Sequence, residues 1–197
     1  MCGIAGFAGF RDDMLLERMC RAISHRGPDD DGFHIEEDVS LGMRRLSIID
    51  LTTGKQPIEN EDGSVVVVYN GEIYNYKELR QGLMTRGHTL RTATDTECIV
   101  HLYEELGDDC VVPLNGMFAF ALWDRRRRRL LVARDRLGVK PLSYLALPGG
   151  LIFASEIKAI LTHGGYRPAL DPAALHDYLT YMYVPGPGSI FRGIRKL

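Results

Sequence analysis

The chain has 197 residues and lacks the features that would place it in several specialised classes of protein. Its longest apolar run is about the length of MFAFALW, whereas a helix that crosses a bilayer needs roughly 20 apolar residues. The formal net charge is −2, which gives no overall field to attract nucleic acid or a membrane surface. The first residues include no basic segment followed by a long apolar run, so we expect no signal peptide. We therefore predict neither a membrane nor a nucleic-acid partner.

Cysteine is scarce, since the chain contains only Cys2, Cys20, Cys98 and Cys110. None belongs to a C-x-x-C pair, and no Cys/His cluster has the spacing of zinc ligands. The acidic stretch HRGPDDDG lacks the spacing and the distal glutamate of a calcium-binding EF-hand. A chain of this length does not need disulfides for stability. We expect reduced thiols, a cytoplasmic location, no metal site and no cofactor in this part of the protein.

The sequence does contain many short strands, and two consecutive helices separate an earlier group of strands from a later one. Apolar spacing and caps predict helices over residues 13–24, 76–87, 94–107 and 156–162. Strands are predicted over residues 2–10, 63–74, 117–124, 129–135, 142–147 and 151–155, with another that begins near residue 39. The Asn-Gly pair at 70–71 is typical of a hairpin turn, and Asp95 is a candidate helix cap. This order of elements favours antiparallel sheets covered by helices over a repeated βαβ unit.

The composition of the sequence changes after residue 163. HGGYRPALDP is rich in turn residues, and a helix then begins with Asp171 as its cap and Pro172 at its first position. The following VPGPGSIFRGIRKL resembles a loop. We predict one domain over residues 2–163, and a linker with the start of a second domain over residues 164–197.

Cys2 has two interpretations. A cysteine in a first strand is ordinarily a small buried apolar residue. If Met1 is removed, however, one residue carries both a thiol and a free α-amine, with typical pKa values of about 8.5 and about 7.7–8.0. Such an amine can act as the base for its own thiol, so no separate catalytic histidine is needed.

Three other motifs could complete a site around this thiol, and each also has a purely structural interpretation. In YNGEIYN, the amide of Asn70 and the N–H of Gly71 could form an oxyanion hole, with the Glu72 carboxylate beside them. One of the arginines in RRLSIID could bind a carboxylate through its guanidinium fork. Asp95 in ATDTE could hold an ammonium group instead of capping its helix.

Taken together, these motifs resemble the glutaminase domain of glutamine-dependent asparagine synthetases, which are class II glutamine amidotransferases. The resemblance covers roughly residues 2–163 and rests on the order in which seven motifs occur. They are CGI, HRGPDDDG, RLSIID, YNGEIYN, TDTE, LNGMFAFALWD and ARDRLGVKPL. It implies an α+β fold of the N-terminal-nucleophile hydrolase type, a four-layer αββα sandwich with two antiparallel sheets between helical layers.

The resemblance also assigns roles to individual residues. It implies that Cys2 is the nucleophile that hydrolyses L-glutamine to glutamate and ammonia, and that Asn70 and the Gly71 N–H form the oxyanion hole. The substrate carboxylate is expected at Arg45, with Arg44 left on the surface. The remaining implied substrate contacts are the ammonium site Asp95, the positioning residue Glu72, and the backbone near Ile48 and Ile49.

The family's ATP-binding loop, SGGxDS, is absent, and no G-x-x-x-x-G-K-[ST] motif replaces it. We therefore expect a fragment of a longer enzyme, whose C-terminal synthetase domain uses ATP and magnesium to activate aspartate for the ammonia. An amidotransferase with a different acceptor and a non-catalytic regulatory domain stay open as alternatives, and so does a homodimer. The intact Cys2 argues against the non-catalytic alternative. The arginine run at 125–129 favours a solvated hairpin turn over a nucleic-acid site.

Overall fold

The computed structural model describes residues 2–46 and 54–197, which form two antiparallel sheets. Sheet A has six strands in the spatial order β10-β8-β9-β1-β3-β2, and sheet B has four in the order β4-β5-β6-β7. The strands of sheet A are β1 (Gly3–Ala8), β2 (Asp30–Ile35), β3 (Val39–Arg45), β8 (Ser143–Leu147), β9 (Gly150–Ala154) and β10 (Ile194–Lys196). Those of sheet B are β4 (Ile58–Glu59), β5 (Val65–Ile73), β6 (Gly116–Asp124) and β7 (Arg129–Arg134).

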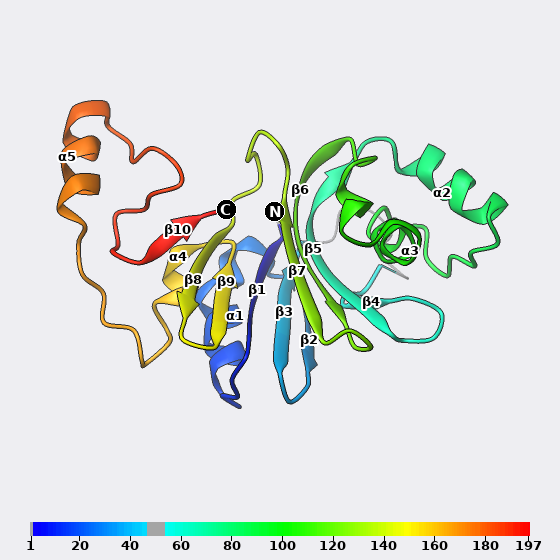
Figure 1. Ribbon diagram of the computed structural model, residues 1–197, viewed down its shortest axis with the longest axis horizontal. Coiled ribbons are helices and arrows are strands. Elements are labelled where there is room, and N and C mark those ends of the chain that lie inside the picture. Colours follow the sequence, from blue (N-terminus) through cyan, green and yellow to red (C-terminus); the bar gives the residue numbers. More distant parts are fainter. Residues whose placement is uncertain (1, 47–53) are drawn as a thin grey trace.

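The two sheets lie face to face between two helical layers (Figure 1). The helices on sheet A are α1 (Leu15–Ala22) and α4 (Ile157–Ile160), and those on sheet B are α2 (Tyr76–Thr85) and α3 (Glu97–Leu106). Two short 3-10 helices, η1 (Ser24–Arg26) and η2 (Gly107–Val111), join these elements, and α5 (Pro172–Tyr181) lies to one side of the sandwich. The predicted α+β, four-layer αββα architecture is confirmed.

The residues of β5 explain why this sandwich has three apolar layers. Val66 and Val68 face sheet A, whereas Val65, Val67 and Tyr69 face the helices α2 and α3. Because alternate residues of a strand point to opposite faces, a strand buried on both sides needs an unbroken apolar run. The tetrad VVVV therefore places β5 in the centre of the molecule, between the inter-sheet core and the helical layer.

Two sequence-based predictions were wrong in this region. Asn70 and Gly71 lie inside β5, paired with Ala119 and Phe118 of β6, and form no hairpin turn. The acidic stretch HRGPDDDG, where no strand was predicted, begins β2 at Asp30, because the strand pairs with β3 along its whole length. In both cases pairing with a neighbouring strand overrides the local turn preference.

The C-terminal residues combine a predicted helix with an unpredicted strand. Asp171 caps α5 by accepting hydrogen bonds from the N–H groups of Ala173 and Ala174, as expected. The segment expected to be a loop ends in β10, which pairs with β8 at the edge of sheet A. Residues 164–197 are thus attached to the first sheet, and the boundary at residue 163 stays a prediction.

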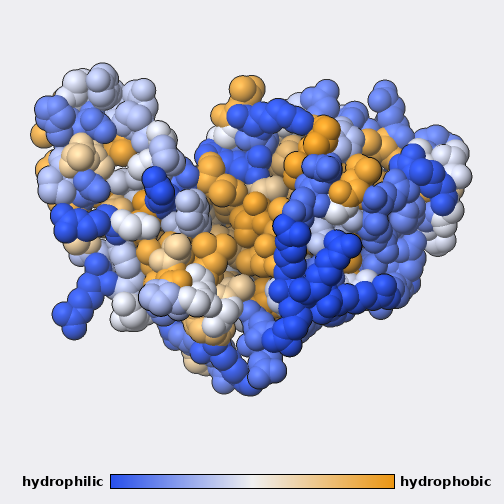
Figure 2. Space-filling model, in the orientation of Figure 1, coloured by the Kyte–Doolittle hydropathy of each residue, from blue (hydrophilic) through white to orange (hydrophobic). Residues whose placement is uncertain are grey.

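Strongly hydrophilic side chains gather over the end of sheet B where β6 turns into β7 (Figure 2). All five arginines of this run pair with acidic side chains: Arg125 with Glu36 and Glu59, Arg126 with Asp62, Arg127 with Asp124, Arg128 with Asp38, and Arg129 with Asp108. The run is therefore the predicted solvated hairpin, with its charge balanced locally. Among the described residues, no helix has the length and apolar character needed to cross a membrane.

Candidate active site

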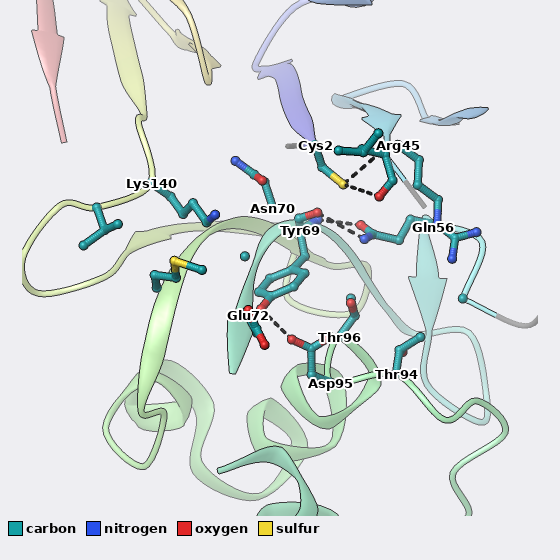
Figure 3. A pocket seen from close by; sticks show the side chains of 15 residues that line it. Cys2, Arg45, Gln56, Tyr69, Asn70, Glu72, Thr94, Asp95, Thr96 and Lys140 are labelled. Carbon is teal, nitrogen blue, oxygen red and sulfur yellow. Dashed lines mark hydrogen bonds between the residues drawn. The ribbon is translucent and has the colours of Figure 1, made fainter. Parts of the chain in front are cut away.

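A cavity of about 310 Å³ opens between the ends of β1, β3 and β5 and the beginning of α3 (Figure 3). Small-molecule sites in proteins generally occupy about 300–1,000 Å³, so this cavity suits a ligand the size of an amino acid. Its lining includes six residues that the sequence singled out, namely Cys2, Arg45, Asn70, Gly71, Glu72 and Asp95. Residues from four distant segments thus share one cavity.

Cys2 lies directly before β1, with its thiol at the edge of this cavity. Its Sγ accepts a hydrogen bond from the Leu46 N–H at 3.4 Å and faces the Leu46 carbonyl oxygen at 3.6 Å. A main-chain N–H directed at sulfur also provides a hydrogen bond for a thiolate. The other three cysteines are buried and free, and burial raises the pKa of each thiol to about 12. Of the four, Cys2 alone reaches this cavity.

Asn70 and Gly71 line the same cavity from the middle of β5. Asn70 is 2% exposed, and among the described residues its Nδ2 has no hydrogen-bond partner. A buried amide donor without a partner costs stability, so its retention is typical of a site that binds a ligand oxygen. A Cβ on Gly71 would lie 2.4 Å from the Met117 main-chain oxygen, so only glycine fits this strand without displacement.

The two neighbouring arginines point to different surroundings. Arg45, at the end of β3, is 7% exposed and lines the cavity. Arg44 donates through Nε to the Gly27 carbonyl oxygen at 3.1 Å and lies 3.6 Å from Asp31. Arg44 does not line the cavity, and this contact holds its side chain half-buried against the loop before β2.

Asp95 does not cap α3, whose N-cap is Thr96 and has no side-chain cap hydrogen bond. Its Oδ2 instead accepts from the Tyr69 hydroxyl at 2.7 Å (Figure 3). The same oxygen accepts from the Ile73 N–H at 2.9 Å. Burial, together with the Asp95 carboxylate, raises the pKa of Tyr69 well above its ordinary value, so the phenol stays protonated and donates. The carboxylate is therefore anchored to β5 inside the cavity.

Glu72 lines the cavity from β5 with an exposed side chain. Ile48 and Ile49, whose backbone was expected to line the pocket, lie outside the residues that the structure describes, as does Met1.

Sequence reasoning missed several lining residues, of which Gln56 is the most informative. Its amide forms a pair of hydrogen bonds with the main chain of Tyr69: Tyr69 N–H to Oε1 at 2.6 Å, and Nε2 to the Tyr69 oxygen at 3.1 Å. Since β4 is only two residues long, this side chain continues the pairing of the β5 edge next to Asn70. Other missed lining residues are Thr94, Thr96, Met117, Val139 and Lys140.

Comparison with known protein families identifies the family of the chain. The model of the family described as glutamine amidotransferase domain matches residues 1–197. The chain belongs to this family.

Curated relatives of this amidotransferase domain are considerably longer. The chain is 49% identical over 170 residues to asparagine synthetase (glutamine-hydrolyzing) 2 of Bacillus subtilis, an alignment that covers 83% of this chain and 22% of the relative. It is 41% identical over 206 residues to synthetase 3 of the same organism, covering 100% of this chain and 33% of the relative. The chain thus spans about a fifth to a third of the length of these relatives.

Solved structures confirm the fold. The amidotransferase domain superposes on a glutamine phosphoribosylpyrophosphate amidotransferase of B. subtilis, complexed with ADP and GMP, with a TM-score of 0.70. The match covers 82% of this chain and 43% of the other at 21% sequence identity, and it therefore bears on the fold alone. The fold is the αββα sandwich of N-terminal-nucleophile hydrolases.

Proposed function

We propose that the domain hydrolyses the side-chain amide of L-glutamine to glutamate and ammonia, with Cys2 as the nucleophile. The observation that carries this proposal is the cavity in which the Cys2 thiol and the Asp95 carboxylate meet Asn70 Nδ2, which has no hydrogen-bond partner among the described residues. The site requires removal of Met1, which exposes the α-amine of Cys2 as the base.

The free amino acid binds through its charged end. Arg45 receives the α-carboxylate, since a guanidinium fork matches a carboxylate. Asp95 receives the α-ammonium group, with Oδ2 already held by Tyr69 and Ile73. Glu72 and the backbone near Ile48 and Ile49 complete the contacts.

The reaction then runs through a thioester. The Cys2 thiol gives its proton to its own α-amine, and the thiolate attacks the amide carbon. Asn70 Nδ2 and the Gly71 N–H hold the oxyanion, a contact worth roughly 3–4 kcal/mol per donor in other enzymes. The carbon–nitrogen bond breaks, and the amide nitrogen leaves as ammonia with the proton from the α-amine. Water then cleaves the thioester, giving glutamate and restoring the thiol.

A Cys2→Ala variant tests the proposal, with Cys110→Ala as the matched control because Cys110 is buried in η2 away from the cavity. We expect Cys2→Ala to release no ammonia from glutamine and Cys110→Ala to remain active. Mass spectrometry of the active protein should show that Met1 is absent. Full activity of Cys2→Ala, or of a protein that retains Met1, would overturn the proposal.

The longer protein is proposed to pass this ammonia to ATP-activated aspartate and form asparagine. The names and lengths of the curated relatives support this acceptor. The phosphate-binding loops named above are absent from the sequence, so ATP and magnesium are assigned to a C-terminal synthetase domain. Such a domain would also cover an apolar face at α5, where four large apolar side chains are exposed: Leu175, Tyr178, Leu179 and Met182.

The full-length protein tests the acceptor. Incubated with amide-labelled ¹⁵N-glutamine, aspartate, ATP and magnesium, it should yield ¹⁵N-asparagine. Glutamine hydrolysis without labelled asparagine would point to a different acceptor and would leave the glutaminase proposal standing.

A further inference from the structure

A second group of chemically capable side chains lies on the helical side of sheet B. It consists of Glu61 from the β4–β5 connection, His88 from the segment after α2, and His101 and Glu104 from α3. One ligand atom from each residue lies within 4.8 Å of those of the other three. None of the four lines the glutamine cavity. We propose that these residues form a binding site for a divalent transition metal, with zinc as the best-fitting ion.

The spacing of the ligand atoms suits a tetrahedral ion. Zinc bonds to nitrogen and oxygen of about 2.0 Å place neighbouring tetrahedral ligands roughly 3.3 Å apart. His101 Nδ1 lies 2.9 Å from Glu104 Oε2 and 3.3 Å from Glu61 Oε2. His88 Nδ1 lies 3.6 Å from Glu104 Oε2 and 3.8 Å from Glu61 Oε1. The 3.8 Å separation is to the second carboxylate oxygen of Glu61, whereas the other three join one atom of each residue and bracket the tetrahedral value. Since one ligand atom of each residue lies within 4.8 Å of the other three, small side-chain movements would seat one ion between the four groups.

Both imidazole rings have the orientation that metal-bound histidines adopt. A ligating histidine directs its second nitrogen at a carboxylate, which fixes the ring and strengthens the ligand. The Nε2 atoms of His88 and His101 point away from the proposed centre, the first toward Glu105 Oε1 at 3.2 Å and the second toward Glu97 Oε1 at 3.9 Å. His101 is 1% exposed, and among the described residues its Nε2 has no hydrogen-bond partner.

The two carboxylates are held in the same way. Glu104 Oε1 accepts a hydrogen bond from Asn60 Nδ2 at 2.7 Å, which leaves Oε2 to face the histidines. Glu61 Oε1 accepts from the Thr89 N–H at 3.0 Å, and its Oε2 faces His101. Each of the two carboxylates is thus positioned by a second contact before any ion binds.

The donor set selects the class of ion. Calcium and magnesium prefer oxygen ligands alone, and copper(I) prefers sulfur. Two imidazole nitrogens with two carboxylate oxygens suit zinc and its neighbours in the first transition row. Two carboxylates and one divalent ion are also electrically neutral together. The competing account balances the carboxylates by protons on the imidazoles, with no metal.

The proposed ion would tie the helical layer to the edge of sheet B. Glu61 follows β4, and His101 and Glu104 lie on α3, which packs against β4 and β5 (Figure 1). The beginning of α3 follows Asp95 directly, so the ion would brace the helix that leads out of the cavity. Sequence spacing indicated no metal site, because Glu61, His88 and the α3 pair come from three separate segments.

Zinc binding to chelator-treated protein tests this proposal. The measurements are made in the Cys2→Ala background, since the exposed thiol is itself a zinc ligand. Equilibrium dialysis should find one tightly bound zinc per chain that excess magnesium does not displace. Cobalt(II) at the same site should give a tetrahedral spectrum without thiolate absorption.

Variants at the site test whether these side chains bind the zinc. His88 is on a surface segment, so His88→Ala should fold and weaken zinc binding at least about 100-fold. Glu104→Gln should also weaken zinc binding. His176→Ala, on the exposed side of α5, is the control and should bind zinc as the parent does. Absence of stoichiometric zinc binding, or equal binding by the parent and His88→Ala, would overturn the proposal. Because binding is the readout, failure here leaves the glutaminase proposal untouched.

Discussion

Arg26 Nε donates a hydrogen bond to the main-chain oxygen of Cys2 across 2.9 Å, although the two residues are 24 positions apart in the sequence. Arg26 is itself held by Glu156 Oε1, 3.0 Å from its Nη1. The next residue, Gly27, packs so closely on Arg44 that a Cβ would lie 2.4 Å from the Arg44 oxygen. Arg26 of the HRGPDDDG motif therefore holds the main chain of Cys2 in place, while Gly27 allows the close approach to β3.

Arg26 is accordingly a positioning residue for Cys2. Arg26→Gln should lower the kcat for glutamine hydrolysis about 10- to 100-fold, since a small misplacement of a reacting group costs that much. KM should change little, because Arg26 does not line the cavity. Arg26→Lys should restore part of kcat. Arg21→Gln, which removes an exposed ion pair with Glu17, is the control and should be fully active; a loss confined to KM would contradict this role.

Glu156 should make the stability of the domain depend on acid pH. Burial raises the pKa of its carboxyl, but hydrogen bonds from Arg26, His25 and Lys158 outweigh this and lower it to about 2. A folded pKa below the unfolded one stabilises the fold above about pH 4.5 and loses this effect as the pH falls toward 2. The contribution at pH 7 is up to about 3 kcal/mol, at 1.4 kcal/mol per pKa unit.

Urea unfolding at pH 7 and pH 3 measures this effect. Glu156→Gln should be less stable than the parent at pH 7, and most of the difference should vanish at pH 3. Glu17→Gln, which removes only an exposed ion pair, should change stability by less than about 1 kcal/mol at either pH. A difference between Glu156→Gln and the parent that stays constant with pH would refute the prediction.

The sequence predicted the residues of the site, but it did not predict the contacts that hold them in place. Cys2, Arg45, Asn70 and Asp95 were placed together by motif order, and they do share one cavity. The supporting contacts escaped prediction because they join residues far apart in sequence: Glu156 lies 130 residues from Arg26.

Local sequence patterns also gave wrong or missing predictions where a residue interacts with a distant part of the fold. Asn-Gly is a turn signal, but β6 pairs with it and keeps it extended. Asp95 matches a helix cap, yet its carboxylate bonds to Tyr69 and Ile73 across the helix–sheet boundary. Gln56 gives no signal at all, since its side chain substitutes for a strand that ends too early. Sequence patterns record local preference, whereas these three roles depend on tertiary neighbours.

Asn70→Ala should remove the oxyanion donor with little effect on the fold. We expect kcat to fall about 100- to 1,000-fold, with KM near its original value. Stability should change little, because the described residues offer Nδ2 no partner to lose. Steady-state ammonia release and urea unfolding measure the two effects.

Asn75 provides the opposite pattern in the same YNGEIYN motif. Its side chain donates to the Pro113 oxygen and accepts from the Asn115 N–H, so it holds a loop and does not line the cavity. Asn75→Ala should therefore lose about 1–2 kcal/mol of stability and keep its kcat. Equal kcat losses in the two variants would argue against an oxyanion role for Asn70.

Two glycine-to-alanine substitutions should have opposite effects on stability. In Gly71→Ala the new Cβ would meet the Met117 oxygen at 2.4 Å and Phe118 at 2.8 Å, so β5 and β6 must separate. We expect a loss of about 1–3 kcal/mol, with reduced kcat because the Gly71 N–H moves. In Gly82→Ala, inside α2, the nearest atom is the flexible Arg86 Nη1 at 3.2 Å. There the better helix propensity of alanine should add about 1 kcal/mol and leave kcat unchanged. Urea unfolding measures the stability of both variants, and steady-state ammonia release measures their kcat. A Gly71→Ala protein as stable and active as the parent would contradict the close contact between β5 and β6.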